Sequence, residues 1–227
     1  MFDRLNLSAN LRGALSFVFG TAFLVTNDTL VKLQSAEMPI GQWIFVRAWF
    51  AVAFTLLACW WLGVLDHLKD LADRAVMARA SVNCVSMFTY MAALIHMPIA
   101  NVATIMQVLP LALTAASALL LAERVGIRRW SAVAVGFVGV LIVIRPGSDG
   151  FNIWALSALL TVALVVARDL ITRSVSADVP SILITLASSI AVLISAGVYS
   201  ATEEWAELTF ANISVLVASA GFLTISK

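Results

Sequence analysis

The sequence predicts an all-α fold, a polytopic bundle of membrane-spanning helices built as an inverted five-plus-five helix repeat whose second repeat is truncated. Apolar residues make up 62% of the 227 residues and charged residues 12%, and mean hydropathy is +0.99. A soluble domain of this composition would lack a polar surface. The apolar residues gather in stretches of about 20 residues, the length with which a helix crosses a bilayer core of about 30 Å. In addition, the start of the chain matches a later part of it in one ungapped register.

Seven apolar stretches have the length of a membrane span, and an eighth begins near the end of the sequence. The first stretch carries polar residues late and has no small-residue cleavage site, so we expect it to remain as a helix. The connections are short, which leaves no room for an extramembrane domain. In chain order the predicted spans are Gly13–Gln34, Gly41–Leu62, Ala80–Met97, Ile99–Ala122, Trp130–Ile144, Ile153–Thr172, Ser181–Ser200 and residues from Asn212 onward.

Prolines mark several of these helices. Pro39, Pro98 and Pro180 stand close to predicted helix starts, where the missing N–H of proline costs little. Pro110 stands in the middle of the fourth span, where it should bend the helix and free backbone carbonyls. Such a bend is tolerated where neighbouring helices or a water-filled cavity satisfy the freed groups, so it fits either a packed bundle or a solute pathway.

The charges of the connections predict the orientation, because basic residues favour the cytoplasmic side. With the amino terminus inside, the outer connections are chiefly acidic, at Glu37, Asp149, Glu203, Glu204 and Glu207, with Arg145 and the helix-end Lys32 as exceptions. The inner side then holds Arg4, Arg12, Lys69, Arg74, Arg79, Arg124, Arg128, Arg129 and Arg173. We therefore expect a multi-pass protein of the inner (plasma) membrane with a cytoplasmic amino terminus.

An internal repeat relates the first span to the sixth at an offset of 141 residues. In this register Ala14-Leu15-Ser16 falls on Ala155-Leu156-Ser157, Asp28 on Asp169, Lys32 on Arg173 and Pro39 on Pro180. The repeating unit holds five spans, an odd number, so the second copy enters the membrane in the opposite sense, a plan that secondary transporters often use. We expect residues 1–147 to form the first five-helix repeat and residues 148–227 a partial second one. The chain reads as an incomplete ten-span protein, with a natural short form as the alternative.

One family has the same order of proline, acidic residue and glycines around its fourth and fifth helices. Here the pattern is Pro110, then Leu120-Leu121-Ala122-Glu123-Arg124, Gly136, Gly139 and Arg145-Pro146-Gly147. In this the sequence resembles the EamA-type branch of the drug/metabolite transporter superfamily. The stretches at residues 27–32, 45–48 and 167–173 resemble a subgroup labelled S-adenosylmethionine or riboflavin carriers. The resemblance implies a secondary transporter of small polar metabolites, amino-acid-like, nucleoside-like or vitamin-like. Alternating access would occur between two inverted repeats.

Other classes of function find less support in the sequence. A formal net charge of +1 without clusters of Lys and Arg argues against a nucleic-acid partner. Cys59 and Cys84 stand singly in apolar runs, so we expect neither a metal site nor another cofactor. Motifs of membrane hydrolases are absent, and we expect no enzymatic activity. A membrane-embedded enzyme, a channel and a non-transporting assembly protein remain alternatives, and a homodimer is compatible with the sequence.

Four ionisable residues stand out inside predicted spans: Asp28, Arg47, Arg168 and Asp169. Each costs about 2.5–3.5 kcal/mol to insert, so each requires a partner or an aqueous face. They either line a substrate route or pair with one another to fix helix packing. For Arg168 and Asp169, which lie nearer the inner interface, packing is the favoured interpretation. Asp28 and Arg47 lie at matching depth below the outer edge on adjacent helices, so we expect them to pair.

Polar side chains form a second group of candidates. Asn83, Ser86 and Tyr90 recur on one face of the third span, and Thr104, Gln107 and Thr114 recur on the fourth around Pro110. Such a face can line a cavity or hydrogen-bond to the next helix. The predicted substrate-binding residues are therefore Asp28, Arg47, Asn83, Tyr90, Thr104, Gln107, Arg168 and Asp169.

Overall fold

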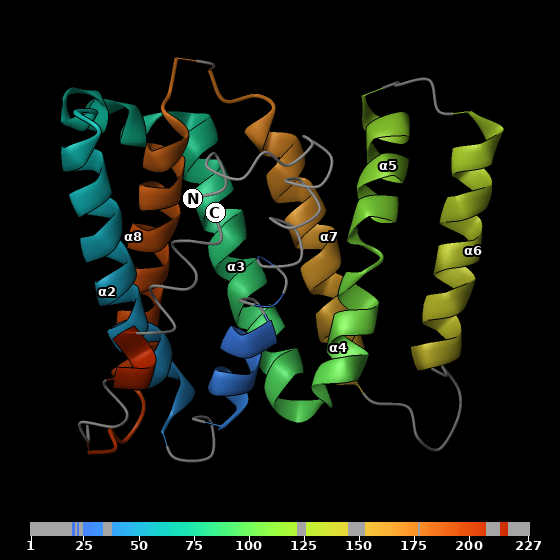
Figure 1. Ribbon diagram of the computed structural model, residues 1–227, viewed down its shortest axis with the longest axis horizontal. Coiled ribbons are helices and arrows are strands. Elements are labelled where there is room, and N and C mark those ends of the chain that lie inside the picture. Colours follow the sequence, from blue (N-terminus) through green and yellow to red (C-terminus); the bar gives the residue numbers. More distant parts are fainter. Residues whose placement is uncertain are drawn as a thin grey trace, which may run out of the picture. The chain divides into compact units, whose positions relative to one another are not determined.

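The computed structural model describes residues 20, 22, 25–33, 38–121, 126–144, 153–176, 178–207 and 214–217, and all regular structure within them is helical. The helices are α2 (Ile40–Trp61), η2 (Leu65–Ala72), α3 (Arg74–His96), α4 (Ile99–Met106), α5 (Leu109–Leu120), α6 (Ile127–Ile144), α7 (Trp154–Thr172) and α8 (Ser181–Ser200) (Figure 1). Residues 25–33 and 214–217 are helical as well. The predicted all-α fold is thus confirmed, whereas the repeat arrangement stays a prediction.

Within the residues that the structure describes, four helical segments are long and apolar enough to cross a membrane. They are Ile40–Trp61, Ile99–Leu120, Trp154–Thr172 and Ser181–Ser200, which correspond to the second, fourth, sixth and seventh predicted spans. α3 and α6 are continuous helices over the third and fifth predicted spans. Half of the first predicted span and most of the eighth lie outside the described residues.

The prolines act as the sequence predicts. α2, α4 and α8 each begin at the residue after a proline, and the carbonyls of Pro39, Pro98 and Pro180 accept the first hydrogen bonds of these helices. Proline fits this position because its nitrogen has no hydrogen to donate and the first N–H groups of a helix have no partner within it. Pro110 interrupts the fourth span: α4 ends at Met106, and α5 begins at Leu109.

The described residues fall into two compact units, one within residues 55–195 and one within residues 1–54 and 196–227. In the first unit α7 packs along α3 and also contacts α4 and α5, and α6 packs on α5 and α4 (Figure 1). Their shared core is apolar and consists of Ala93, Met97, Val102, Ile105, Val108, Val140, Ala155, Ala158 and Val162. The interruption in the fourth span places Ile105 and Val108 in this core.

In the second unit the start of α2 is tied to the segment that follows α8. The carboxylate of Glu203 accepts hydrogen bonds from the backbone N–H of Gly41 at 3.1 Å and of Gln42 at 3.0 Å. The fully buried Gln42 side chain exchanges two further hydrogen bonds of 2.8 Å with the backbone of Ala206. A segment distant in sequence therefore caps the first turn of α2.

Candidate functional site

The candidate site is built on the polar faces of α3 and α7. α3 begins after Asp73, whose carboxylate caps it by accepting from the N–H groups of residues 75 and 76. Its polar residues then recur at helical spacing on one face, as do those of α7. On α3 they are Arg79, Asn83, Ser86 and Thr89, and on α7 they are Ser157, Thr161, Arg168 and Thr172.

Hydroxyl groups join the two faces at one end. The hydroxyl of Ser157 donates to the backbone carbonyl of Thr89 at 2.8 Å, and the hydroxyl of Thr161 lies 2.8 Å from that of Thr89. Thr161 is only 2% exposed, so these bonds are sheltered from lipid and water. Earlier residues of α3 contact later residues of α7, as Asn83 does with Arg168, so the two helices are antiparallel.

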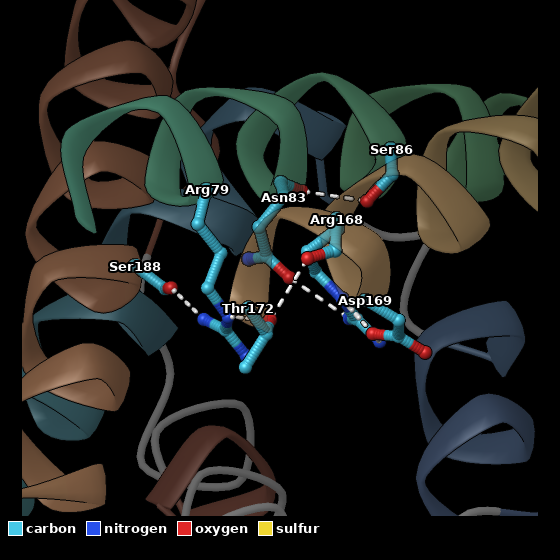
Figure 2. A network of polar contacts seen from close by, with 7 residues as sticks. All are labelled: Arg79, Asn83, Ser86, Arg168, Asp169, Thr172 and Ser188. Atoms are coloured by element: carbon cyan, nitrogen blue, oxygen red, sulfur yellow. Dashed lines mark hydrogen bonds and ion pairs between the residues drawn. The ribbon is translucent and has the colours of Figure 1, made fainter. Parts of the chain in front are cut away.

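Charged groups lie at the other end of the faces. Arg168 donates from Nη1 to Oδ1 of Asn83 at 3.1 Å and from Nε to Oδ1 of Asp169 at 2.9 Å. A second nitrogen, Nη2, lies 2.8 Å from the same carboxylate oxygen, which completes an ion pair between neighbouring residues of α7 (Figure 2). The pairing that is the favoured interpretation for Arg168 and Asp169 is thus present, and Arg168 also links α7 to α3 through Asn83.

Arg79 connects three helices. Its Nε donates to the hydroxyl of Thr172 on α7 at 2.7 Å, and its Nη1 donates to the hydroxyl of Ser188 on α8 at 3.0 Å (Figure 2). Thr172 and Ser188 donate their own hydrogens to carbonyls of their own helices, those of Arg168 and Ile184. A hydroxyl carries a single hydrogen, so both oxygens act as acceptors toward Arg79.

The structure gathers three of the predicted site residues, Asn83, Arg168 and Asp169, in this network. The others of the same unit lie elsewhere. Tyr90 packs against the apolar core, and Gln107 is exposed at the interruption of the fourth span. Thr104 donates to the carbonyl of residue 100 in its own helix. The substrate-binding role of all these residues stays a prediction.

Asp28 and Arg47 lie in the other compact unit. Arg47 is 7% exposed although it is charged, and its guanidinium carbon lies 4.7 Å from the centre of the Trp43 ring. The negative charge of Asp28 acts on this guanidinium. The buried arginine is therefore accompanied by a carboxylate and an aromatic face, both of which favour a cation.

Sequence reasoning missed Arg79, Thr172 and Ser188 as members of the network. Arg79 was counted among the basic residues of an inner connection, because it immediately precedes the third apolar stretch. Its spacing of four residues from Asn83 is the signal that places it on the same helical face. No comparable pattern marks Ser188, because serines are common in this apolar segment.

Comparison with known proteins covers the larger part of the chain. A model of the EamA-like transporter family matches residues 11–145. A riboflavin transporter of Rhizobium johnstonii is 31% identical over 166 residues, which cover 72% of this chain and 55% of the relative. A riboflavin transporter of Vibrio cholerae is 27% identical over 64% of this chain and 50% of its own. The pseudopaline exporter CntI of Pseudomonas aeruginosa is 24% identical over 73% of this chain and 58% of its own.

The chain spans about half the length of these curated relatives. No solved structure matches it. The family match covers more than half of the chain, including the proline, acidic residue and glycines of the fourth and fifth spans. The resemblance noted in the sequence is thereby confirmed, and the chain belongs to the EamA-like transporter family of the drug/metabolite transporter superfamily.

Proposed function

We propose that the chain is part of a secondary transporter that carries small polar metabolites along the polar face shared by α3 and α7. The observation that carries this proposal is the set of hydroxyl, amide and charged groups through which the faces of α3 and α7 contact each other. Polar and ionisable groups at membrane depth are costly, so they are expected where a polar solute or water passes. Arg168, Asp169 and Asn83 would then contact the substrate at one end of these faces.

The substrate class follows from the relatives and from the site together. The relatives are named for two different solutes, riboflavin and pseudopaline, so they support a class of polar metabolites and not one compound. A site with both guanidinium and carboxylate groups suits amino-acid-like, nucleoside-like or vitamin-like molecules. Tyr90, Thr104 and Gln107 would line the route beyond the network, and Asp28 and Arg47 would provide a second charged pair.

Alternating access would arise by rocking of two inverted repeats, residues 1–147 and the partial copy from residue 148 onward. The support is the sequence register that places Asp28 on Asp169 and Pro39 on Pro180. The protein would work in the inner membrane with its amino terminus in the cytoplasm, as a monomer or a homodimer. A membrane-embedded enzyme or a non-transporting assembly protein is the alternative, and binding followed by saturable flux separates these functions.

Ligand binding and flux test the proposal in sequence. Purified protein is screened by thermal unfolding against riboflavin, amino acids and nucleosides, because a ligand that binds only the folded state raises the melting temperature. Flux of each stabilising compound is then measured in proteoliposomes that hold the full-length transporter, because we expect residues 1–227 alone not to transport. We expect saturable flux, lowered at least about tenfold by Arg168→Gln, which removes charge-assisted hydrogen bonds.

Arg128→Gln is the matched control, since Arg128 is exposed and its side chain lies outside the network. We expect its flux to equal that of the unmodified protein. Flux that rises linearly with concentration would indicate a channel and contradict the proposal. A protein that neither binds nor moves any of these compounds would favour the assembly role.

A further inference from the structure

We propose that Arg79 is an anion-binding residue whose guanidinium holds a carboxylate or phosphate group of the transported molecule. The inference rests on the proposed function and deepens it, because it predicts that the transported metabolite carries a negatively charged group. It concerns a residue at the junction of α3, α7 and α8 that the sequence assigned only to an inner connection.

The hydrogen bonds of Arg79 leave much of its capacity unused. A guanidinium has five N–H groups, and Arg79 donates two of them, to Thr172 and Ser188. Three N–H groups, including both on Nη2, therefore have no partner in the part of the chain that the structure describes. The side chain is half-buried, so a ligand can still reach these donors.

Among the described residues, no carboxylate pairs directly with the charge of Arg79, although the charge of Asp169 acts on it from a greater distance. The network contains two guanidinium groups and one carboxylate, and that carboxylate binds two nitrogens of Arg168. The acceptors of Arg79 are neutral hydroxyls, and among the described residues no carboxylate forms an ion pair with it. A partly buried positive charge of this kind attracts an anion, and the planar fork of arginine matches carboxylate and phosphate oxygens.

The two hydroxyls hold the guanidinium in a fixed orientation. Figure 2 shows it between Ser188 on one side and Thr172 on the other. Ser188 is 4% exposed. The hydroxyl hydrogens of Thr172 and Ser188 are both bonded to carbonyls of their own helices, so the two hydroxyl groups are fixed with their oxygen lone pairs available to Arg79. A preorganised donor loses less freedom when a ligand binds.

The internal register gives independent support. At the offset of 141 residues Asp169 stands where the first copy has Asp28, but Ser188 stands where it has Arg47. The second copy thus lacks its own cation on the second helix. Arg79 donates a hydrogen bond to Ser188, the residue at the position where the second copy lacks a cation. Because Asp169 is already engaged by Arg168, the cation supplied by α3 remains available to an external anion.

Equilibrium binding of simple anions tests the proposal. The full chain in a neutral detergent is unfolded thermally in the presence of inorganic phosphate or acetate, with sodium chloride at the same ionic strength as reference. We expect a saturable rise in melting temperature beyond that in chloride. Arg79→Gln should weaken the apparent affinity at least about tenfold, because it removes the charge and most donors.

Arg74→Gln is the matched control, since Arg74 is an exposed arginine of the same helix and its side chain takes no part in the network. Its anion response should equal that of the unmodified protein. An unmodified protein that does not distinguish phosphate or acetate from chloride would overturn the proposal, as would an unchanged response in Arg79→Gln. If Arg79→Gln does not fold, Arg79→Lys decides: an unchanged affinity would overturn the proposal, because lysine lacks the planar fork.

Nanodiscs separate a solute from a lipid headgroup as the source of the anion. A response to soluble phosphate in phosphatidylcholine nanodiscs supports a substrate group. Stabilisation by added phosphatidylglycerol that requires Arg79, with no response to soluble anions, assigns the site to lipid and overturns its role in transport. Anion binding at Arg79 without flux of any metabolite would contradict the proposed function but not this inference. Flux that is unaffected by Arg79→Gln would contradict this inference but not the proposed function.

Discussion

At the scale of single residues, the hydroxyl groups of the network share one behaviour. Ser86, Thr172 and Ser188 each donate their hydrogen to a carbonyl of their own helix, three or four residues earlier. This back-bonding is common for serine and threonine in apolar helices. The oxygen lone pairs then remain for a neighbouring donor, and Arg79 uses two of them. A face rich in hydroxyls is thus a face of acceptors, which can hold a guanidinium in place without neutralising it.

The pair of Asp28 and Arg47 gives the first prediction at this scale. Asp28→Asn alone should lower the free energy of unfolding by about 3–5 kcal/mol, because it leaves the buried charge of Arg47 without its partner. Arg47→Gln should cost less, because Asp28 is only half-buried. The double variant should cost less than the sum of the two single changes. Denaturant titration in detergent micelles measures these values, with Arg128→Gln as the control at an exposed position. Full additivity of the two changes would contradict the pairing.

At the scale of elements, α2 depends on a contact from outside its own sequence. The first N–H groups of a helix have no partners within it, and here Pro39 provides no side-chain acceptor. Glu203 provides the missing acceptors, since its two carboxylate oxygens accept hydrogen bonds from the backbone N–H groups of Gly41 and Gln42. The negative charge also lies at the positive end of the helix dipole. Gly41 allows the close approach, because a Cβ there would lie 2.6 Å from Oε2 of Glu203.

Removal of this cap should destabilise the protein measurably. Glu203→Gln keeps one acceptor but loses the charge, so we expect the free energy of unfolding to fall by about 1 kcal/mol. Gly41→Ala should act in the same direction by displacing the carboxylate. Glu204→Gln, at an exposed neighbouring residue, serves as the control and should have little effect. Equal stability of Glu203→Gln and the unmodified protein would show that the cap contributes nothing to folding.

At the scale of the whole molecule, the sequence predicts the position of each helix better than it predicts which helices pack against one another. Bilayer thickness imposes the length of each apolar stretch, and proline imposes a start, so α2, α4 and α8 begin where expected. Asn83, Arg168 and Asp169 were found because polar groups stand out in apolar helices. Arg79 escaped because an arginine at the edge of a span looks like one in a connection. Which helix faces which is set by packing between apolar surfaces that resemble one another, so the link to Ser188 required the structure.

The last prediction concerns the topology of the molecule in the membrane. α2 has 22 residues and is therefore about 33 Å long at 1.5 Å per residue, enough to cross a bilayer core of about 30 Å. Glu203 binds the first turn of this helix, whereas η2, which carries Lys69, follows its end. The two exposed segments should consequently lie on opposite sides of the membrane.

Single cysteines decide the orientation once Cys59 and Cys84 have been replaced. The basic residues place the segment with Lys69 in the cytoplasm, so a cysteine at position 69 should react with an impermeant thiol reagent only after the membrane is opened. A cysteine at position 204 should react in intact cells. The reverse pattern would place the amino terminus outside while keeping the two segments opposed. Labelling of both positions from one side would contradict the assignment of α2 as a membrane-spanning helix, because the two ends of one straight helix of this length cannot meet the same surface.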